Sequence, residues 1–328
     1  MTATPPDRTP MPLDAAADSL RRVHDAIAQR IVGQDNAIED ALLAFLARGH
    51  LLVEGVPGTA KTLLVRALAG ALGARFSRVQ FTPDLMPSDV TGVSILREQT
   101  REFEFRAGPI FTDILLADEI NRAPAKTQSA LLEAMAERQV TVDGKTHLLD
   151  ELFTVYATQN PVEHEGTYPL PEAQLDRFLL KTVVSYPSRE AELAMLANHE
   201  AGFDPERAGG LDVQPVLTMA EARALRLLVN DVRVAPDVQQ YVASITRATR
   251  EEPSIALGAS PRATVALMRC ARAGAVLDGR DFVTPDDVKA RVLSVLRHRV
   301  MLSPELEVEG RSVDDVLSVV VSRVPAPQ

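Results

Sequence analysis

Gly-Val-Pro-Gly-Thr-Ala-Lys-Thr occupies residues 55–62, between an apolar run at residues 51–53 and a helical pattern at residues 63–72. The stretch matches G-x-x-x-x-G-K-[ST], in which glycines let backbone N–H groups turn inward around phosphate oxygens. The helix that follows directs its N-terminus at the same anion. A strand, this loop and a helix in that order predict a Walker A phosphate-binding loop.

Each residue type in the loop has a separate expected task. Lys61 reaches the β- and γ-phosphates, and the Thr62 hydroxyl is a ligand for Mg²⁺. We therefore expect ATP and Mg²⁺ as cofactors. The expected nucleotide contacts in this loop are Gly55, Val56, Pro57, Gly58, Thr59, Ala60, Lys61, Thr62 and Leu63.

The amino-acid composition argues against several classes of protein. The 328 residues carry a formal net charge of −10 with 4% aromatic residues and no Trp, which argues against a broad basic or aromatic surface for nucleic acid. Cys270 is the only cysteine and the six histidines lack metal-ligand spacing, so disulfide scaffolds and protein-ligated transition metals are not expected. One cysteine fits a reducing cytoplasm, and no apolar stretch approaches the ~20 residues of a membrane span.

The order of apolar runs predicts the architecture. Five runs, at residues 51–53, 76–81, 114–117, 153–157 and 178–184, alternate with helical segments, which favours a mainly parallel sheet covered on both faces. After residue 187 only helical patterns follow, with Ser188, Thr218 and Thr284 as expected N-caps. We expect a disordered tail at 1–13, an α/β nucleotide-binding core at 14–187 and a smaller all-α domain at 188–328.

Two further polar groups end strands of this sheet. Asp118 and Glu119 follow the run at 114–117 as a Walker B pair, Asp118 as a second Mg²⁺ ligand and Glu119 as the base that activates water. Asn160 follows the run at 153–157, where it either hydrogen-bonds that water or the γ-phosphate, or only forms a turn. Ligands of open parallel sheets bind at these strand ends.

These motifs together resemble the AAA+ ATPases, and more narrowly the MoxR family. The resemblance spans about residues 31–299 and rests on GVPGTAKT at 55–62, DEINRAP at 118–124, TQNP at 158–161 and EGTYPLPEAQLDRF at 165–178. It implies an AAA+ P-loop NTPase core with a five-stranded mainly parallel sheet, followed by an all-α lid. It also implies an ATPase that acts as a ring, expected to be a hexamer.

The resemblance assigns roles to single residues. Asn160 matches sensor 1, Arg177 the arginine finger that one subunit inserts into its neighbour's site, and Arg262 sensor 2. Gly33 and Gln34 match the segment that lines the adenine pocket. The open alternatives are an Arg177–Asp176 surface pair, a solvated Arg262 and a plain helix-linking turn at Gly33.

Two hairpins are expected within the core. Residues 92–96 and 102–106 pair as one, since the second segment alternates with period 2, and Asp143-Gly144 forms the turn of another at 139–147. They resemble inserts of the MoxR, magnesium-chelatase and replicative-helicase group. Phe103 and Phe105 either grip a substrate in a central pore or pack the hairpin on its own domain. Arg122 is either a second trans-acting cation or solvated.

The resemblance implies a chaperone-like output: remodelling or maturation of a client protein, through a partner with a von Willebrand factor A domain. A DNA-associated motor and a magnesium-chelatase-like subunit are the alternatives. Residues 94–106 carry three Arg against three Glu, and residues 137–150 two basic side chains against three acidic ones in Glu137, Asp143 and Asp150. Balanced charge weakens phosphate-dependent DNA binding, so nucleic acid is not expected as a partner.

Overall fold

The computed structural model describes residues 11–99, 101–161, 166–204 and 213–327. Residues 1–10 of the expected tail therefore lie outside the described residues, and the first helix, α1, begins at Leu13. Within the described ranges, no helix combines the length and apolarity needed to cross a membrane.

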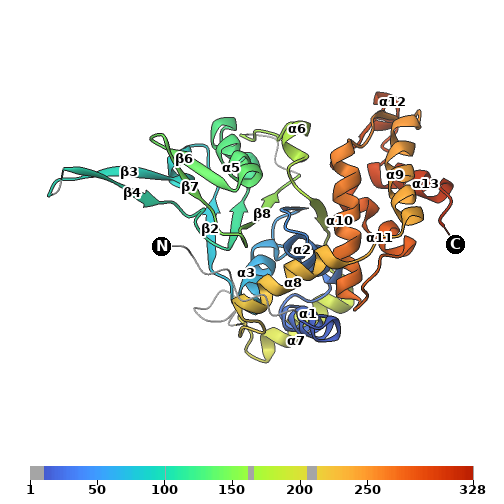
Figure 1. The fold of residues 1–328 in the computed structure, drawn as a ribbon, viewed down its shortest axis with the longest axis horizontal. Helices are drawn as coiled ribbons and strands as arrows, with labels where there is room; N and C mark the ends of the chain where they lie inside the picture. The colour runs from blue at the N-terminus through green and yellow to red at the C-terminus, as the bar shows by residue number, and fades with distance from the viewer. Residues whose placement is uncertain (1–10, 100, 162–165, 205–212, 328) are drawn as a thin grey trace.

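A five-stranded parallel sheet forms the centre of the molecule, as the order of apolar runs predicts (Figure 1). Its strand order is β2-β5-β8-β1-β9, and each neighbouring pair is parallel. The order places β8 and β1, whose carboxyl ends precede Asn160 and the Walker A loop, side by side. The strands are β1 (Leu51–Gly55), β2 (Phe76–Gln80), β5 (Ile114–Asp118), β8 (Thr154–Gln159) and β9 (Leu180–Val184).

Alternate residues of these strands enter two separate hydrophobic clusters. Leu116 joins the cluster under α1 (Leu13–Ala28), α2 (Asp35–Leu46) and α3 (Lys61–Ala71). Leu115 joins the cluster under α5 (Ala125–Glu137). Because side chains of a strand point to opposite faces in turn, helices cover both faces of the sheet.

Both expected hairpins form. β3 (Gly92–Arg97) pairs antiparallel with β4 (Glu102–Ala107), and Figure 1 shows this hairpin extending away from the body of the molecule. β6 (Gln139–Val142) pairs with β7 (Lys145–Leu148) through a turn in which Asp143 and Gly144 have φ of 50° and 74°. Positive φ at both central residues is the type I′ geometry that the Asp-Gly pair favours.

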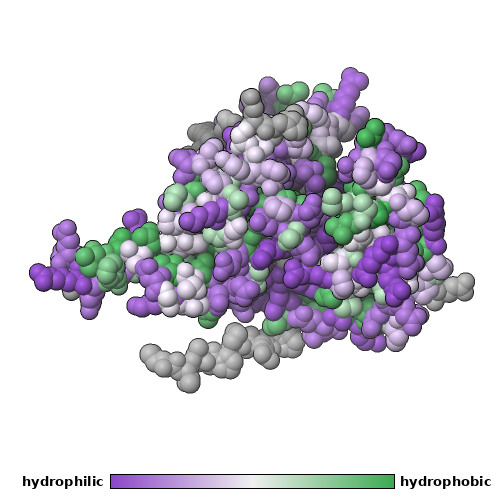
Figure 2. Space-filling view, turned by 90° about the horizontal axis from the view of Figure 1, so that it is seen from above, coloured by the Kyte–Doolittle hydropathy of each residue, from purple (hydrophilic) through white to green (hydrophobic). Residues whose placement is uncertain are grey.

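The two phenylalanines of the projecting hairpin differ in environment. Phe105 stacks on His147 with ring centroids 3.8 Å apart and contacts Phe111 edge-on, so it packs the hairpin on its own domain. Phe103 is 71% exposed. In Figure 2 the arm combines apolar side chains near its base with a hydrophilic tip.

Helices dominate the chain after β9, and three of them start at the caps that the sequence predicts. Ser188, Thr218 and Thr284 each accept a hydrogen bond from the backbone N–H three residues on. The helices are α7 (Arg189–Glu200), α8 (Met219–Asp231), α9 (Pro236–Glu251), α10 (Pro261–Leu277), α11 (Pro285–Leu296), α12 (Pro304–Val308) and α13 (Val313–Arg323).

This helical region is not purely α, which corrects one detail of the expectation. β10 (Ile255–Leu257) pairs antiparallel with β11 (Met301–Leu302), because two extended connectors run side by side and satisfy each other's backbone groups. One hydrophobic cluster also runs from α1 to α3 into the helices after β9. The division into domains at residue 187 therefore stays a prediction.

Candidate nucleotide-binding site

The Walker A loop joins the carboxyl end of β1 to the N-terminus of α3. Gly58 has φ of 79° and Ala60 has φ of 60°, so the loop turns through left-handed backbone before Lys61 starts the helix. A Cβ on Gly55 would lie 2.5 Å from Val184 O, so β9 passes too close for a side chain there. Gly58 therefore serves the turn, and Gly55 permits the close approach of β9.

The loop is held by its own hydrogen bonds. Lys61 Nζ donates to Gly55 O at 2.6 Å and to Val56 O at 2.7 Å. Thr59 Oγ1 donates to Val56 O at 2.9 Å. Leu63 packs against the hydrophobic cluster and anchors the first turn of α3. The side chains expected to bind phosphate thus converge on one loop at the strand's carboxyl end.

Asp118 and Thr62 supply oxygen atoms at the same edge. Thr62 Oγ1 donates to Asp118 Oδ2 at 3.3 Å, and Thr158 Oγ1 donates to Asp118 Oδ1 at 2.6 Å. The Asp118 side chain is 9% exposed. A carboxylate and a hydroxyl with remaining room for phosphate and water are a donor set that suits Mg²⁺. The residues present therefore fit the cation that the motifs imply.

Glu119 lies beside this pair in strained backbone. Its φ and ψ are 56° and 50°, and its N–H donates to Thr158 Oγ1 at 2.8 Å. Its Oε2 accepts from Gln80 Nε2 at 2.7 Å and lies 3.2 Å from Arg122 Nη1. Arg122 thus contacts a carboxylate of its own chain in this structure. A non-glycine residue in left-handed backbone is common at functional sites, where surrounding contacts hold it.

Asn160 directly follows β8, the strand between β5 and β1. It is 7% exposed. The strand order therefore places it between Asp118 and the Walker A loop, as expected for a residue near the terminal phosphate.

Gly33 and Gln34 reach the same edge from outside the sheet. Gln34 Nε2 donates to Ser185 O at 3.1 Å, directly after β9, and Gly33 has φ of 74°. A Cβ on Gly33 would lie 2.6 Å from Ala191 Cβ at the start of α7. The segment therefore lies beside the carboxyl end of β9, at the edge of the sheet where the adenine pocket is expected.

The sequence motifs do not reveal three residues that contact the Walker B pair, namely Arg78, Gln80 and Thr158. Arg78 donates to Asp118 Oδ2 through Nε at 3.0 Å and through Nη2 at 2.7 Å. Gln80 pairs in register with Asp118 across β2 and β5. The available signal for Arg78 and Gln80 is their position on either side of Val79, on a strand that ends at the same edge as the Walker B pair.

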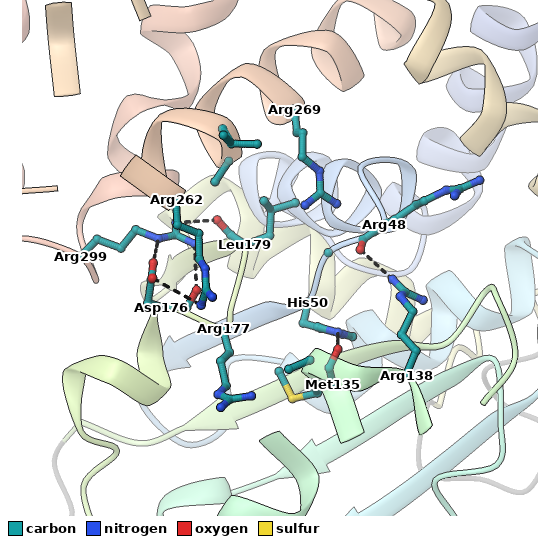
Figure 3. A pocket seen from close by; sticks show the side chains of 14 residues that line it. Arg48, His50, Met135, Arg138, Asp176, Arg177, Leu179, Arg262, Arg269 and Arg299 are labelled. Carbon is teal, nitrogen blue, oxygen red and sulfur yellow. Dashed lines mark hydrogen bonds and ion pairs between the residues drawn. The ribbon is translucent and has the colours of Figure 1, made fainter. Parts of the chain in front are cut away.

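Arg177 and Arg262 lie elsewhere, beside a cavity of about 390 Å³ at the amino ends of β1 and β9 (Figure 3). Arg177 Nη1 donates to Leu132 O at 2.9 Å, and Arg262, in the first turn of α10, lies 3.6 Å from Asp176 Oδ2. Asp176 pairs with Arg262 and Arg299, so the alternative of an Arg177–Asp176 surface pair is not observed. The five residues of β1 separate this edge from the Walker A edge by about 13 Å.

Two family models match the chain. Residues 50–180 match an ATPase family associated with various cellular activities (AAA), and residues 247–319 match an AAA lid domain. The first range contains four strands of the central sheet and the first residue of β9, and the second runs from the end of α9 into α13.

Similar proteins span nearly the whole chain. YeaC of Bacillus subtilis (strain 168) is 49% identical over 94% of this chain and 95% of its own length. Chaperone MoxR1 of Mycobacterium tuberculosis is 42% identical over 96% of this chain and 84% of its own. The crystal structure of an ATPase from Cytophaga hutchinsonii superimposes with a TM-score of 0.87 at 39% identity, over 96% and 97% of the two chains.

Proposed function

The chain belongs to the MoxR family of AAA+ ATPases, and from this premise we propose that it hydrolyses ATP at the interfaces of a six-subunit ring to remodel or mature a client protein. One observation supports the interfacial mechanism. The Walker A and Walker B residues lie at the carboxyl-end edge of the sheet, the Walker edge, and Arg177 lies at the opposite edge. An arginine at the amino edge of the sheet, across the length of β1 from its own phosphate loop, is placed to serve a neighbouring copy.

The roles at the Walker edge follow from the groups gathered there. The Walker A backbone and Lys61 hold the phosphates, and Thr62 and Asp118 hold Mg²⁺, which neutralises charge on the phosphates when bound. Glu119 accepts a proton from the attacking water. Asn160 orients that water or the terminal phosphate. Gly33 and Gln34 contact the adenine.

Arg177 and Arg262 complete the site from the adjoining copy. A guanidinium directed at the terminal phosphate stabilises negative charge that develops in the transition state. Arg262 borders the same cavity as Arg177 and lies on the lid, so its contact with the neighbour's nucleotide would change when the phosphate is cleaved. That change is the proposed route from hydrolysis to movement of the lid.

The proposed client role draws on the relative named Chaperone MoxR1. We further propose a partner with a von Willebrand factor A domain and a cytoplasmic location, the latter because the sequence holds a single cysteine. The DNA-motor alternative has less support, because the hairpin with Arg97, Arg101 and Arg106 also carries Glu98, Glu102 and Glu104.

Mixing two inactive variants tests the interfacial mechanism. Lys61→Ala should lose nucleotide binding, and Arg177→Ala should keep binding but lose hydrolysis by on the order of 10³-fold. In mixed rings, an Arg177→Ala chain supplies an intact Walker site and a Lys61→Ala neighbour supplies its arginine, so ATPase activity should partly return.

Phosphate release measured across mixing ratios gives the readout. The matched control mixes Lys61→Ala with the double variant Lys61→Ala/Arg177→Ala, which contains no intact Walker site and should stay inactive. Native mass spectrometry verifies that mixed rings form. Mixed rings without any recovered activity would contradict the proposal, as would full activity of Arg177→Ala alone.

A further inference from the structure

The cavity beside Arg177 has an uneven charge balance. Asp176 is the only acidic residue among the described residues that line it, and it lies 2.6 Å from Arg299 Nε and 3.6 Å from Arg262 Nη1. The opposite side is lined by Arg48, Arg138 and Arg269. None of these three forms an ion pair within the described ranges, although the whole chain has a net charge of −10. The positive charge on this side is therefore not balanced locally.

The three arginines come from different parts of the chain, and the side chains of Arg138 and Arg269 are held by carbonyl oxygens. Arg138 caps α5 with φ of 53° and donates to Arg48 O at 2.8 Å. Arg269, on α10, donates to Ala47 O. Figure 3 shows Arg269 entering from the lid helix and Arg138 from the core below, with Arg48 at the rim. The carbonyl groups of Ala47 and Arg48, at the end of α2, hold these two side chains but carry no net charge to neutralise them.

Burial and repulsion from neighbouring arginines both act against two of these cations, Arg138 and Arg269. Burial, followed by the charges of Arg48 and Arg269, lowers the pKa of Arg138 below its ordinary value. Burial likewise lowers the pKa of Arg269, and Arg48 adds to the effect. The buried ring of His50 hydrogen-bonds Val155 N and Met135 O, and no acidic side chain accompanies it on this side of the cavity among the described residues. An anion in the cavity would relieve this repulsion.

We propose that Arg48, Arg138 and Arg269 form a phosphate-binding subsite. Three unneutralised guanidinium groups match a phosphate dianion better than a single carboxylate, and their planar donors suit phosphate oxygens. A volume of about 390 Å³ lies within the size range of small-molecule sites. The phosphate comes either from free solution or from the nucleotide of an adjoining copy, since Arg177 borders the same cavity.

Inorganic pyrophosphate is the probe, titrated calorimetrically into the full chain in a Lys61→Ala background that weakens the Walker A site. Arg48→Ala and Arg269→Ala should each weaken binding at least tenfold. Arg247→Ala, which removes an equally positive charge from an exposed position on α9, should leave affinity within twofold. Arg48 is exposed and its side chain holds no other residue of the described chain, so Arg48→Ala is expected to fold. Thermal melting verifies that Arg48→Ala and Arg269→Ala are both folded.

Pyrophosphate binding that is absent, or equal in all three variants, would overturn the subsite. The two possible sources of the phosphate are then distinguished in variants that retain Lys61. If free phosphate is the ligand, Arg48→Ala and Arg269→Ala relieve inhibition of the ATPase by added pyrophosphate and leave the KM for ATP unchanged. If the neighbour's nucleotide is the ligand, the KM for ATP rises several-fold and only at concentrations where rings form. The first titration needs no hydrolysis, so it fails or succeeds independently of the proposed function.

Discussion

Asp118 illustrates how one side chain can be shared between several partners. Its Oδ2 accepts from Arg78 and from Thr62, and its Oδ1 accepts from Thr158. The Arg78 guanidinium thus neutralises the oxygen that a cation at Thr62 would use. Arg78 is 47% exposed, so its charge is partly screened and its side chain is free to move outward.

We expect Arg78→Gln to lower the Mg²⁺ concentration needed for nucleotide binding, because removal of a nearby cation strengthens the attraction of Asp118 for a divalent ion. Partial exposure limits the effect to roughly threefold to tenfold. Fluorescence titration of a labelled ATP analogue at increasing Mg²⁺ measures it. Arg247→Gln serves as the control, and an unchanged or higher Mg²⁺ requirement for Arg78→Gln would argue that Arg78 instead organises the site.

Helix starts are set by local chemistry, and α11 is a clear case. Thr284 Oγ1 accepts from Asp287 N at 3.3 Å while Asp287 Oδ2 accepts from Thr284 N at 2.7 Å. The same carboxylate pairs with Arg280 at 2.6 Å. The cap therefore ties the turn after α10 to the start of α11.

Thr284→Ala should lower the free energy of unfolding by about 1 kcal/mol, since it removes the acceptor for a helix N–H. Urea denaturation of the full chain measures the change. Thr284→Ser retains the hydroxyl and should recover most of the loss. Equal destabilisation by both substitutions would show that the methyl group, not the cap, is responsible.

The elements that could be predicted are those with local signals. The Asp143-Gly144 turn, the Thr284 cap and the Walker A loop each depend on residues within eight positions of one another, and the structure has all three. Arg78 and Asp118 are 40 residues apart, and their contact depends on β2 lying beside β5. Periodicity predicts that both segments are strands but not which strands are neighbours.

The arginine-lined cavity could not be predicted from the sequence either, because it also depends on contacts between segments that are far apart in the chain. Arg48, Arg138 and Arg269 belong to three segments that meet only when the lid packs on the core. Each follows or lies within a helix, where a lone basic residue is unremarkable. Arg177 and Arg262 were predicted only because their surrounding motifs resemble a family, and their shared cavity emerges from the fold.

At the scale of the whole molecule, buried histidines join distant segments. His50 Nδ1 accepts from Val155 N at 2.9 Å, and His298 Nε2 bonds to Phe178 O at 3.1 Å, which ties the end of α11 to the core. Burial is the main cause that lowers the pKa of His50 to about 3 and that of His298 below its ordinary value. Both rings are neutral in the folded state at neutral pH.

Stability should therefore fall as the pH falls from 6.5 toward 3. In that window the unfolded chain protonates His50 and the folded chain does not, so unfolding takes up a proton and becomes easier in acid. His50 alone should contribute a loss of about 2 kcal/mol between pH 6.5 and 5. Urea denaturation at both pH values should show a smaller pH-dependent loss in His50→Gln than in the wild type. His199→Gln, at an exposed position, should keep the full loss; an identical slope in His50→Gln would disprove the assignment.

In the ring that we propose, the placement of Asp118 and Arg177 at opposite edges of the sheet constrains how copies of this chain associate productively. A two-fold dimer brings one surface against itself, so a dimer formed through the Walker A edge alone would leave each phosphate loop facing another phosphate loop. Productive contacts must instead be polar, head to tail, so that every junction is alike and has a direction. A substitution at one edge then inactivates only the site at that subunit interface. A truncated copy that lacks one edge would interrupt the ring at a defined interface.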